Sequence, residues 1–214
     1  MTTLVIIAKQ PVPGAAKTRL HPPLSLEQAA EIAAACLDDT LAALRDLPAT
    51  RRVLFYQGDR LPARSEGYDV IPQTTGTLDE RLGDLFDAVD GPTVLIGMDT
   101  PQVTAADLFP AFTAWPREID AWFGPAEDGG WWALGLRDPR GDLLRGVAMS
   151  QDDTGARTLA RLRAAGLGVG LLPTLRDVDY IDDARRVAGL APRTTFASTL
   201  AAFEHDLVLT GSAR

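Results

Sequence analysis

The sequence predicts an α/β fold, a three-layer sandwich around a mainly parallel, mixed central sheet, on the strength of three observations. Apolar runs typical of strands buried on both faces alternate with alanine- and leucine-rich helical segments up to about residue 118. Beyond that point two apolar runs flank a short polar turn, which indicates an antiparallel hairpin. The 214 residues, 46% of them apolar, suffice for one substantial core, and no repeat or low-complexity linker divides them.

The first half of the chain begins with the continuous apolar run Leu4 to Ala8, which predicts a buried strand. Ser25 and Gln28 form a capping box, and an alanine-rich helix is expected to follow it. Thr77 and Glu80 form a second capping box at the start of another helix. The expected elements of this half are strands over 4–8, 51–57, 68–73 and 92–98, and helices over 25–47, 77–89 and 104–115.

The second half contains a predicted hairpin within 119–136 and fewer strand signals. Pro110, just before it, is expected to interrupt or kink its helix, because proline lacks a backbone donor. Gly166 is expected to end a helix in the left-handed conformation. The remaining expected elements are a helix over 152–166, a strand over 168–173, a loop leading into a helix over 177–190, and a helix over 194–209.

Composition and charge narrow the class of protein. The net charge is −8 and the sequence pI about 4.7, and basic residues are dispersed apart from one loop, so nucleic acid is not an expected partner. No apolar run approaches the ~20 residues that span a bilayer, and the N-terminus lacks the features of a signal peptide. The single cysteine, Cys36, is expected in the core. We expect a cytoplasmic protein without membrane insertion, and a homodimer is compatible with the sequence.

The loop after the first predicted strand, AKQPVPGAAKTRL, is the first candidate for a binding site. It holds Lys9, Lys17 and Arg19 within eleven residues, together with Gly14, which allows close approach of the backbone. Three cations at the carboxyl end of a strand suit a diphosphate or triphosphate, although the spacing is not that of a Walker loop. The alternative is a solvated basic turn.

Three aspartates are candidates for metal ligands. Asp99, in GMDTP, lies where a buried strand is expected to emerge, and Asp177 and Asp179, in DVDYIDD, follow a short strand. Carboxylates at the ends of parallel strands suit Mg²⁺ or Mn²⁺, which prefer oxygen ligands and often bridge protein to phosphate. The alternative is that these aspartates cap turns or helices.

The stretch PAEDGGWW is the fourth candidate segment. Its carboxylates could act as a general base, its glycines could let the backbone approach a ligand, and tryptophan faces suit sugar rings or bases. The alternative is a tight hairpin turn with core tryptophans, and because strand neighbours face opposite ways, one tryptophan is expected in the core. The residues are Glu127, Asp128, Gly129, Gly130, Trp131 and Trp132.

These segments, in this order and at these spacings, resemble a bacterial family of GT-A-like glycosyltransferases long catalogued as a domain of unknown function, including one tied to arsenosugar biosynthesis. The resemblance covers residues 3–190. Wider relatives include molybdenum-cofactor and phospholactate guanylyltransferases. The resemblance implies a single domain of the nucleotide-diphospho-sugar transferase type. This domain has a nucleotide-binding half over 1–117, an acceptor-side half over 118–190 and a C-terminal helical tail over 191–214.

The resemblance also implies roles for individual residues, carried over by position. One acid in Asp99-Thr100-Pro101 stands where glycosyltransferases have D-x-D, and Trp131 stands where a tyrosine is usual. The implied roles are phosphate contacts for Lys9, Lys17 and Arg19, nucleotide binding for Arg81, metal binding for Asp99 with Asp179, and an acceptor-side place for Asp128.

The first hypothesis is therefore a metal-dependent glycosyltransferase that uses a nucleotide-sugar donor and a small-molecule acceptor. Asp128 would deprotonate the acceptor hydroxyl, with Glu127 as the next candidate. The alternative is a nucleotidyltransferase that uses a nucleoside triphosphate and releases pyrophosphate. A second alternative is a non-catalytic nucleotide-binding protein.

Overall fold

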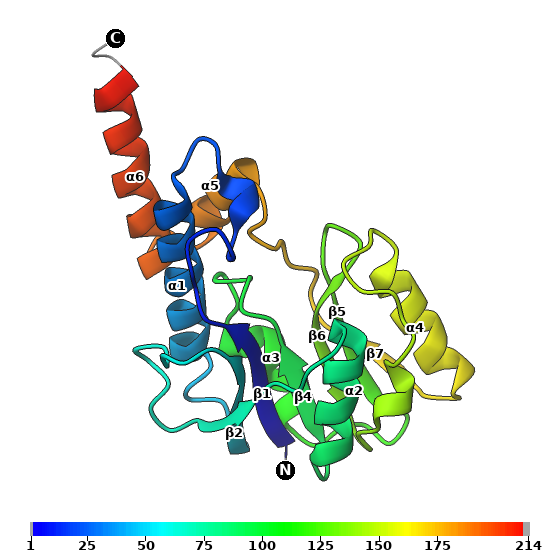
Figure 1. Cartoon of the computed structure of the whole chain (residues 1–214). Helices are drawn as coiled ribbons and strands as arrows, with labels where there is room; N and C mark the ends of the chain where they lie inside the picture. The colour runs from blue at the N-terminus through cyan, green and yellow to red at the C-terminus, as the bar shows by residue number, and fades with distance from the viewer. Residues whose placement is uncertain (1, 212–214) are drawn as a thin grey trace.

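The computed structural model describes residues 2–211, and within them seven strands form one sheet of order β3-β2-β1-β4-β6-β5-β7 (Figure 1). Strand β6 alone of these described strands runs against the others, since β4 and β5 both pair with it antiparallel. The predicted mainly parallel, mixed sheet is confirmed. The strands are β1 (Thr2–Lys9), β2 (Ala49–Gln57), β3 (Asp69–Pro72), β4 (Thr93–Ile96), β5 (Ala121–Pro125), β6 (Trp131–Leu136) and β7 (Val169–Leu171).

The helices begin where the sequence signals place them. Both predicted capping boxes are present, Ser25 with Gln28 and Thr77 with Glu80. Pro110 lies inside its helix, which continues through it and ends at Phe112 rather than at 115. The helices are α1 (Leu26–Ala43), α2 (Leu78–Ala88), α3 (Ala105–Phe112), α4 (Thr154–Ala164), α5 (Ile181–Leu190) and α6 (Thr195–Gly211), with 3₁₀ turns η1 (Thr18–Leu20) and η2 (Gly141–Leu143).

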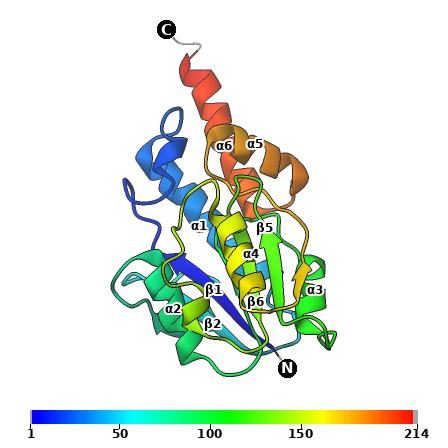
Figure 2. The same ribbon diagram turned by 90° about the vertical axis from the view of Figure 1, so that its right-hand side faces the viewer.

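Alternate side chains of the sheet form two separate cores. Leu4 and Ile6 of β1 belong to a cluster with α1 and α3, whereas Val5 belongs to a cluster with α2 and α4. The helices that cover the sheet are seen in Figures 1 and 2. Apolar residues on both sides of a strand explain why its sequence is a continuous apolar run rather than an alternating pattern. The three-layer sandwich is confirmed.

Helix α1 also packs on its outer side. There Cys36, fully buried, belongs to a third cluster that joins α1 to α5 and α6, so the prediction of a core cysteine is confirmed. The far end of α6 projects from the body of the molecule (Figure 1). The predicted tail over 191–214 is thus mainly α6, and its residues 212–214 lie outside the described part.

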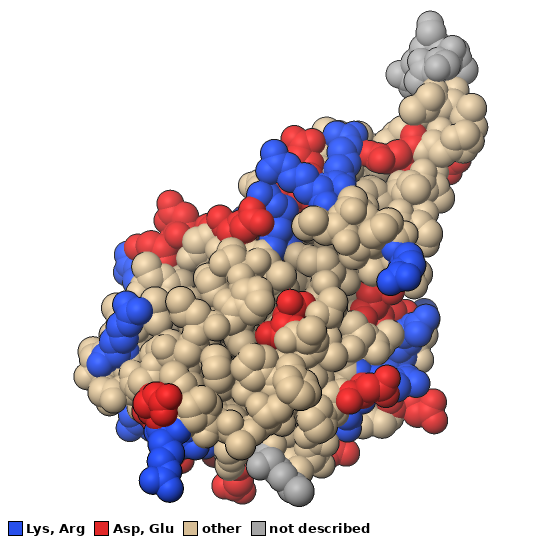
Figure 3. Space-filling view, turned by 180° about the vertical axis from the view of Figure 1, so that it is seen from behind, with Lys and Arg blue, Asp and Glu red and all other residues tan. Residues whose placement is uncertain are grey.

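The surface seen from behind carries charges of both signs. On that face lysine and arginine side chains lie near acidic ones around the margin, and no broad basic area is seen there (Figure 3). Among residues 2–211, none of the helices is both long enough and apolar enough to cross a membrane.

Candidate active site

Four loops converge at the edge where the parallel strands end. The segments that follow β1, β4 and β7 leave the sheet at this edge. Because β6 is antiparallel, the turn between β5 and β6 returns to the same edge. Ligands of open α/β sheets bind in such a crevice, beyond the carboxyl ends of the strands.

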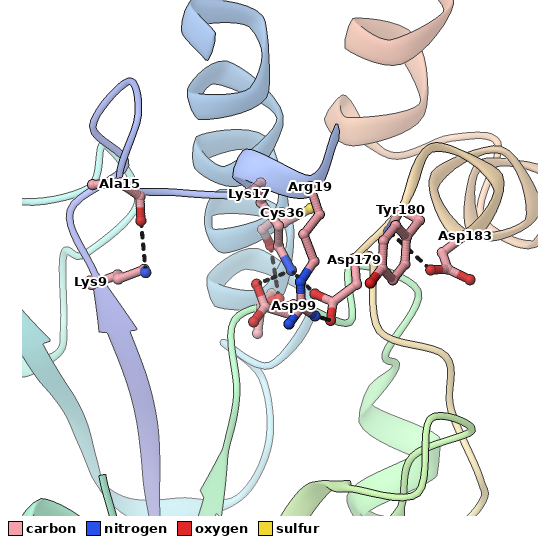
Figure 4. Close-up of polar contacts among 10 residues, drawn as sticks. Lys9, Ala15, Lys17, Arg19, Cys36, Asp99, Asp179, Tyr180 and Asp183 are labelled. Atoms are coloured by element: carbon pink, nitrogen blue, oxygen red, sulfur yellow. Dashed lines mark hydrogen bonds and ion pairs between the residues drawn. The ribbon is translucent and has the colours of Figure 1, made fainter. Parts of the chain in front are cut away.

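The basic loop after β1 is held by its own backbone. The amides of Ala15 and Ala16 donate to the carbonyl of Val12 at 3.0 and 3.1 Å, and Lys9 Nζ donates to the carbonyl of Ala15 at 2.9 Å (Figure 4). Gly14 has a φ of +77°, and a Cβ there would meet only Leu26 within 4 Å. Gly14 therefore serves the turn of the loop, and the side chain of Lys9 lies against the loop itself.

Lys17 points from the start of η1 into the crevice. Its ammonium lies 2.8 Å from Asp99 and 3.1 Å from Asp179, and its side chain is only 7% exposed (Figure 4). Burial opposes the charged form, but the two carboxylates outweigh it and hold the pKa of Lys17 above its usual value. Arg19, from the same 3₁₀ turn, is 59% exposed and reaches Asp179 at 3.0 Å. Two of the three loop cations are thus paired with carboxylates.

The loop before α5 lies directly against the end of β4. The amide of Val178 donates to the carbonyl of Asp99 at 3.0 Å, and the Val178 side chain is fully buried. The flanking residues Asp177 and Asp179 are thereby brought beside Asp99. Burial, followed by the negative charges of Asp99 and Asp128, raises the pKa of Asp177 to about 7.

The two candidate ligands in this loop therefore differ in their surroundings. Asp179 is neutralised by Lys17 and Arg19. Asp177, with its raised pKa, lies where negative charge is in excess, beside Asp99 and Asp128. Relief of that excess would require a cation, so Asp177 has the stronger structural case of the two.

The carboxylates of the β5–β6 turn also have different partners. Arg176 donates to Glu127 and, at 2.8 Å, to Asp183. Asp128 Oδ1 accepts a hydrogen bond of 2.8 Å from the Gly130 amide, and Asp128 has no ion-pair partner among the described residues. Of the two candidate bases, Asp128 is the one whose carboxylate is not bound in an ion pair.

The glycines of this turn are required by packing. Gly129 has a φ of +89°, and a Cβ there would lie 1.8 Å from the carbonyl oxygen of Asp152. The amide of Gly155, at the start of α4, donates to the Gly129 carbonyl at 2.8 Å. Close approach to the segment before α4 therefore explains Gly129, and Gly130 is the member of the pair that lines a cavity.

The two adjacent tryptophans have different surroundings, because neighbours on a strand face opposite sides of the sheet. Trp132 is 2% exposed, and its indole nitrogen donates to the carbonyl of Pro173 at 2.9 Å. Trp131 is half-buried and lines a cavity. The prediction that one of the two belongs to the core is confirmed for Trp132.

Three cavities adjoin one another at this edge, and Asp99 lines all of them. The smallest, about 200 Å³, lies along the basic loop. The second, about 460 Å³, extends over the ends of β1 and β2 towards α2 and has several apolar side chains in its wall; we call it the apolar-walled cavity. The third, about 520 Å³, lies towards α5; we call it the acidic cavity. Asp128, Ser150 and Gln151 line both of the larger ones.

The apolar-walled cavity contains Arg81 and a residue that the sequence did not single out. Gln73 Nε2 donates to the carbonyls of Ala8 at 2.8 Å and Phe55 at 3.0 Å, while its Oε1 accepts a hydrogen bond from Arg81. Gln73 directly follows β3, so its place after a strand was the signal that could have revealed it.

Arg176 and the segment before α4 also went unnoticed in the sequence. Arg176 immediately precedes Asp177, yet a single arginine beside an aspartate gives no sign that it joins two loops. Ser150 has a φ of +58°, and no residue type in the sequence signals this conformation. Both residues line the acidic cavity.

The acidic side chains suit a hard divalent cation in their chemistry. Asp99, Asp128 and Asp177 offer only oxygen ligands. Burial is the main cause of the raised pKa of Asp177, and a cation would relieve the second cause, repulsion from Asp99 and Asp128. Within residues 2–211, no three acidic, histidine or cysteine side chains converge as a complete metal site. Mg²⁺ is usually bound by one or two carboxylates together with substrate phosphates, so an incomplete set fits an ion that binds with a nucleotide.

Comparisons with known proteins identify a family and a fold. The model of a family described as "Uncharacterized protein conserved in bacteria (DUF2064)" matches residues 40–151, and no curated protein matches the chain. A provisionally named nucleotide-diphospho-sugar transferase from Desulfovibrio desulfuricans G20 is 27% identical, over 97% of this chain and 96% of its own, with a TM-score of 0.82.

Two more distant structures share the fold. A nucleotidyl transferase from Methanothermobacter is 15% identical over 90% of this chain and 98% of its own, with a TM-score of 0.59. A manganese complex of Rv0371C from Mycobacterium tuberculosis H37Rv is 22% identical over 87% of this chain and 96% of its own, with a TM-score of 0.50. The predicted fold of the nucleotide-diphospho-sugar transferase type is confirmed.

Proposed function

The chain belongs to the bacterial family DUF2064, and from this premise we propose that it is a metal-dependent glycosyltransferase with a nucleotide-sugar donor and a small-molecule acceptor. The family description assigns no activity. The named solved relatives are transferases of nucleotide-sugar or nucleotidyl type, and this chain shares their fold. The choice between the two reaction types depends on the chemistry of the crevice.

The charge of the acidic cavity is the observation that supports the glycosyltransferase most directly. Seven carboxylate residues and only two arginines line it. The acceptor of a glycosyl transfer is a hydroxyl group, which is neutral, whereas the acceptor in the alternative reaction is a phosphate. A phosphate would be repelled by so many carboxylates, even with one divalent cation present. The carboxylates are Asp99, Glu127, Asp128, Asp152, Asp177, Asp179 and Asp183.

The donor is best accommodated on the other side of Asp99. Arg19 is an exposed cation of the basic loop, and its planar fork suits the diphosphate of a nucleotide sugar. Lys17 holds Asp99 and Asp179 in place and keeps positive charge in the crevice. The rest of the nucleotide then extends into the apolar-walled cavity.

A divalent cation would be held by Asp99, with Asp177 or Asp179 as the second ligand. Manganese in the complex of Rv0371C is consistent with this assignment. When bound, such an ion stabilises negative charge on a leaving nucleoside diphosphate. Among the chain's own residues, Lys17 and Arg19 contribute positive charge to the same end of the donor.

Asp128 is proposed as the general base. It lies at the boundary of the two larger cavities, where donor and acceptor meet, and no ion pair among the described residues occupies its carboxylate. The carboxylate takes the proton of the acceptor hydroxyl, the hydroxyl oxygen bonds to the anomeric carbon of the sugar, and the nucleoside diphosphate leaves with the electrons of the broken bond.

The nucleotidyltransferase remains the second candidate, because three cations close to one crevice also suit a triphosphate. In that reaction an acceptor phosphate attacks the α-phosphorus and pyrophosphate leaves. The likeness in fold to the Methanothermobacter nucleotidyl transferase does not decide between the two.

Product analysis distinguishes the candidates. The protein is incubated with nucleotide sugars or nucleoside triphosphates, Mn²⁺ and a panel of hydroxyl and phosphate acceptors, and the products are separated by ion-exchange chromatography. We expect nucleoside diphosphate from a nucleotide sugar. Pyrophosphate from a triphosphate would establish the nucleotidyltransferase instead, and nucleotide binding without turnover would indicate a non-catalytic binding protein. Asp128→Asn, which is nearly isosteric, is the control for contaminating activity.

A further inference from the structure

The polar end of the apolar-walled cavity is formed by one guanidinium held by one amide. Gln73 is fixed by three hydrogen bonds, two that its amide nitrogen donates to the carbonyls of Ala8 and Phe55 and one that its oxygen accepts from Arg81. This arrangement ties the ends of β1 and β2 to α2. Arg81 is therefore oriented by the sheet, and its guanidinium does not move freely in solvent.

Two hydrogen-bond donors that line this cavity lack partners. Arg81 Nε is buried without a hydrogen-bond partner in the described structure, and so is the indole Nε1 of Trp131, which lines the same cavity. Neither group can accept a hydrogen bond, because guanidinium and indole N–H groups only donate. Buried donors are normally satisfied, so a ligand that carries acceptor atoms is expected here.

The remaining wall suits the face of a flat ring. Apolar and aromatic side chains of this wall come from β1, from α2, from the start of β6 and from the segment before α4. A volume of about 460 Å³ lies within the range of ligand sites, which reach from ~300 Å³ upwards. The larger apolar members of the wall include Ile7, Leu78, Leu82, Met98, Trp131 and Met149.

Building on the proposed function, we propose that the apolar-walled cavity takes the nucleobase and that Arg81, oriented by Gln73, selects the base. A guanidinium favours a base with a carbonyl oxygen on its outer edge, as in uracil or guanine. It disfavours adenine and cytosine, which carry an amino group there, because donor would face donor. The donor is thus a uridine or guanosine diphosphate sugar.

The orientation of the nucleotide follows from the positions of the charges. Asp99 and Lys17 lie where β4 and the basic loop meet, so the phosphates belong at that side. Gln73 follows β3, which lies on the other side of β1 from β4 in the strand order. Its amide reaches the ends of β1 and β2 and there holds the guanidinium of Arg81. Neighbouring strands are ~4.8 Å apart, so this separation leaves room for the ribose between phosphate and base.

The test is a calorimetric titration of the full chain with UDP, GDP, ADP and CDP in the presence of Mn²⁺. We expect UDP or GDP to bind about tenfold or more tightly than both ADP and CDP. Arg81→Lys keeps the positive charge but loses the planar fork. In that variant we expect the preference to fall to about threefold or less, with ADP affinity little changed. Arg51→Lys, at an exposed arginine paired with Asp69, is the matched control and should keep the preference.

The outcomes separate this inference from the proposed function. Equal binding of the four nucleotides, or tighter binding of ADP or CDP, overturns the base selection and leaves a nucleotide site in place. A preference that survives unchanged in Arg81→Lys overturns the role of Arg81. Absence of binding by all four contradicts the proposed function, and the base selection with it. Where Arg81→Lys fails to fold, the wild-type titrations alone decide.

Discussion

Lys17 determines the balance of charge in the crevice. Its ammonium lies between Asp99 and Asp179 and is almost completely buried. A cation in the surrounding water therefore cannot take its place. Without it, these carboxylates and the neighbouring Asp177 would carry negative charge with little compensation. Stability and ligand binding at this edge therefore depend on the same side chain.

We expect Lys17→Met to lower the free energy of unfolding by about 1 to 3 kcal/mol, because it leaves Asp99 unpaired and Asp179 with Arg19 alone in a partly buried site. Urea denaturation at neutral pH measures the change. Arg157→Met is the control, since it removes an exposed pair with Asp153 and should change stability by less than about 0.5 kcal/mol. Equal effects of the two substitutions would show that the Lys17 pairs contribute no more than a surface ion pair.

Asp177 makes the stability of the fold depend on pH, and the direction of this dependence follows from its raised pKa. Its pKa in the folded chain is about 7, above the ordinary value of 3.8, so the folded state holds this proton more tightly than the unfolded state does. Both states are protonated below about pH 4, and the carboxyl destabilises the fold progressively as pH rises to about 7. Above that pH the penalty is complete.

We therefore expect Asp177→Asn to stabilise the chain by about 2 kcal/mol at pH 8 and to have little effect at pH 4. Thermal or urea unfolding across this range, without divalent cations, gives the difference between variant and wild type. Asp90→Asn, at an exposed aspartate before β4, controls for the general effect of losing one negative charge. A difference that is constant with pH, or that is largest at pH 4, would contradict the assignment.

At the scale of elements, the β5–β6 turn and the start of α4 form one unit. Gly129 packs against the backbone of Asp152, and its carbonyl accepts the amide of Gly155. This contact fixes Asp128 between the two larger cavities, beside Ser150 and Gln151. The position of the proposed base, Asp128, thus depends on backbone packing between the β5–β6 turn and the segment before α4.

We expect Gly129→Ala to cost about 3 kcal/mol or more, because the added Cβ would overlap the Asp152 carbonyl at a positive φ. Gly67→Ala is the matched control, since Gly67 has a φ of +83° and an added Cβ there would have no atom within 4 Å, so this change should cost about 1 kcal/mol. Denaturant titration of the two variants compares backbone strain alone with strain plus overlap. Similar costs would mean that the turn does not pack closely against Asp152.

Local signals in the sequence were enough for the elements but not for the partners of the site residues. Capping boxes and apolar runs predicted the starts of α1 and α2 and the strands, because these depend on neighbours in the chain. The sequence also suggested three free cations in the basic loop, whereas Lys17 and Arg19 bind carboxylates about 160 residues away. Such pairings depend on strand order, which no local pattern reveals.

Pairs that share one short segment show the same limit. Asp177 and Asp179 are equivalent in sequence, yet contacts with distant residues make them differ. Asp179 is paired with Lys17 and Arg19. Burial, followed by the charges of Asp99 and Asp128, raises the pKa of Asp177. Glu127 and Asp128 also differ in their partners, because Arg176, from another loop, forms an ion pair with Glu127 and not with Asp128. Gln73 was missed because its role lies in contacts with two strands that precede it in the chain.

For the whole molecule, the sheet order is what assembles the site. Strands β1 and β4 are neighbours although β2 and β3 come between them in the sequence, and this brings the basic loop beside Asp99. Asp99 then lines all three cavities, so the cations proposed to bind phosphate, the proposed metal ligands and the proposed base surround one carboxylate. The proposed site therefore depends more on Asp99 than on any other residue.

The most direct test is calorimetric binding of a uridine or guanosine diphosphate to wild type and Asp99→Asn, each with and without Mn²⁺. Asparagine keeps the shape, and Lys17 retains Asp179 as a partner, so the melting temperature should change little. We predict that Mn²⁺ strengthens binding to wild type by about tenfold or more and that this enhancement is lost in the variant. An enhancement that is the same in both proteins would contradict a metal and nucleotide site centred on Asp99.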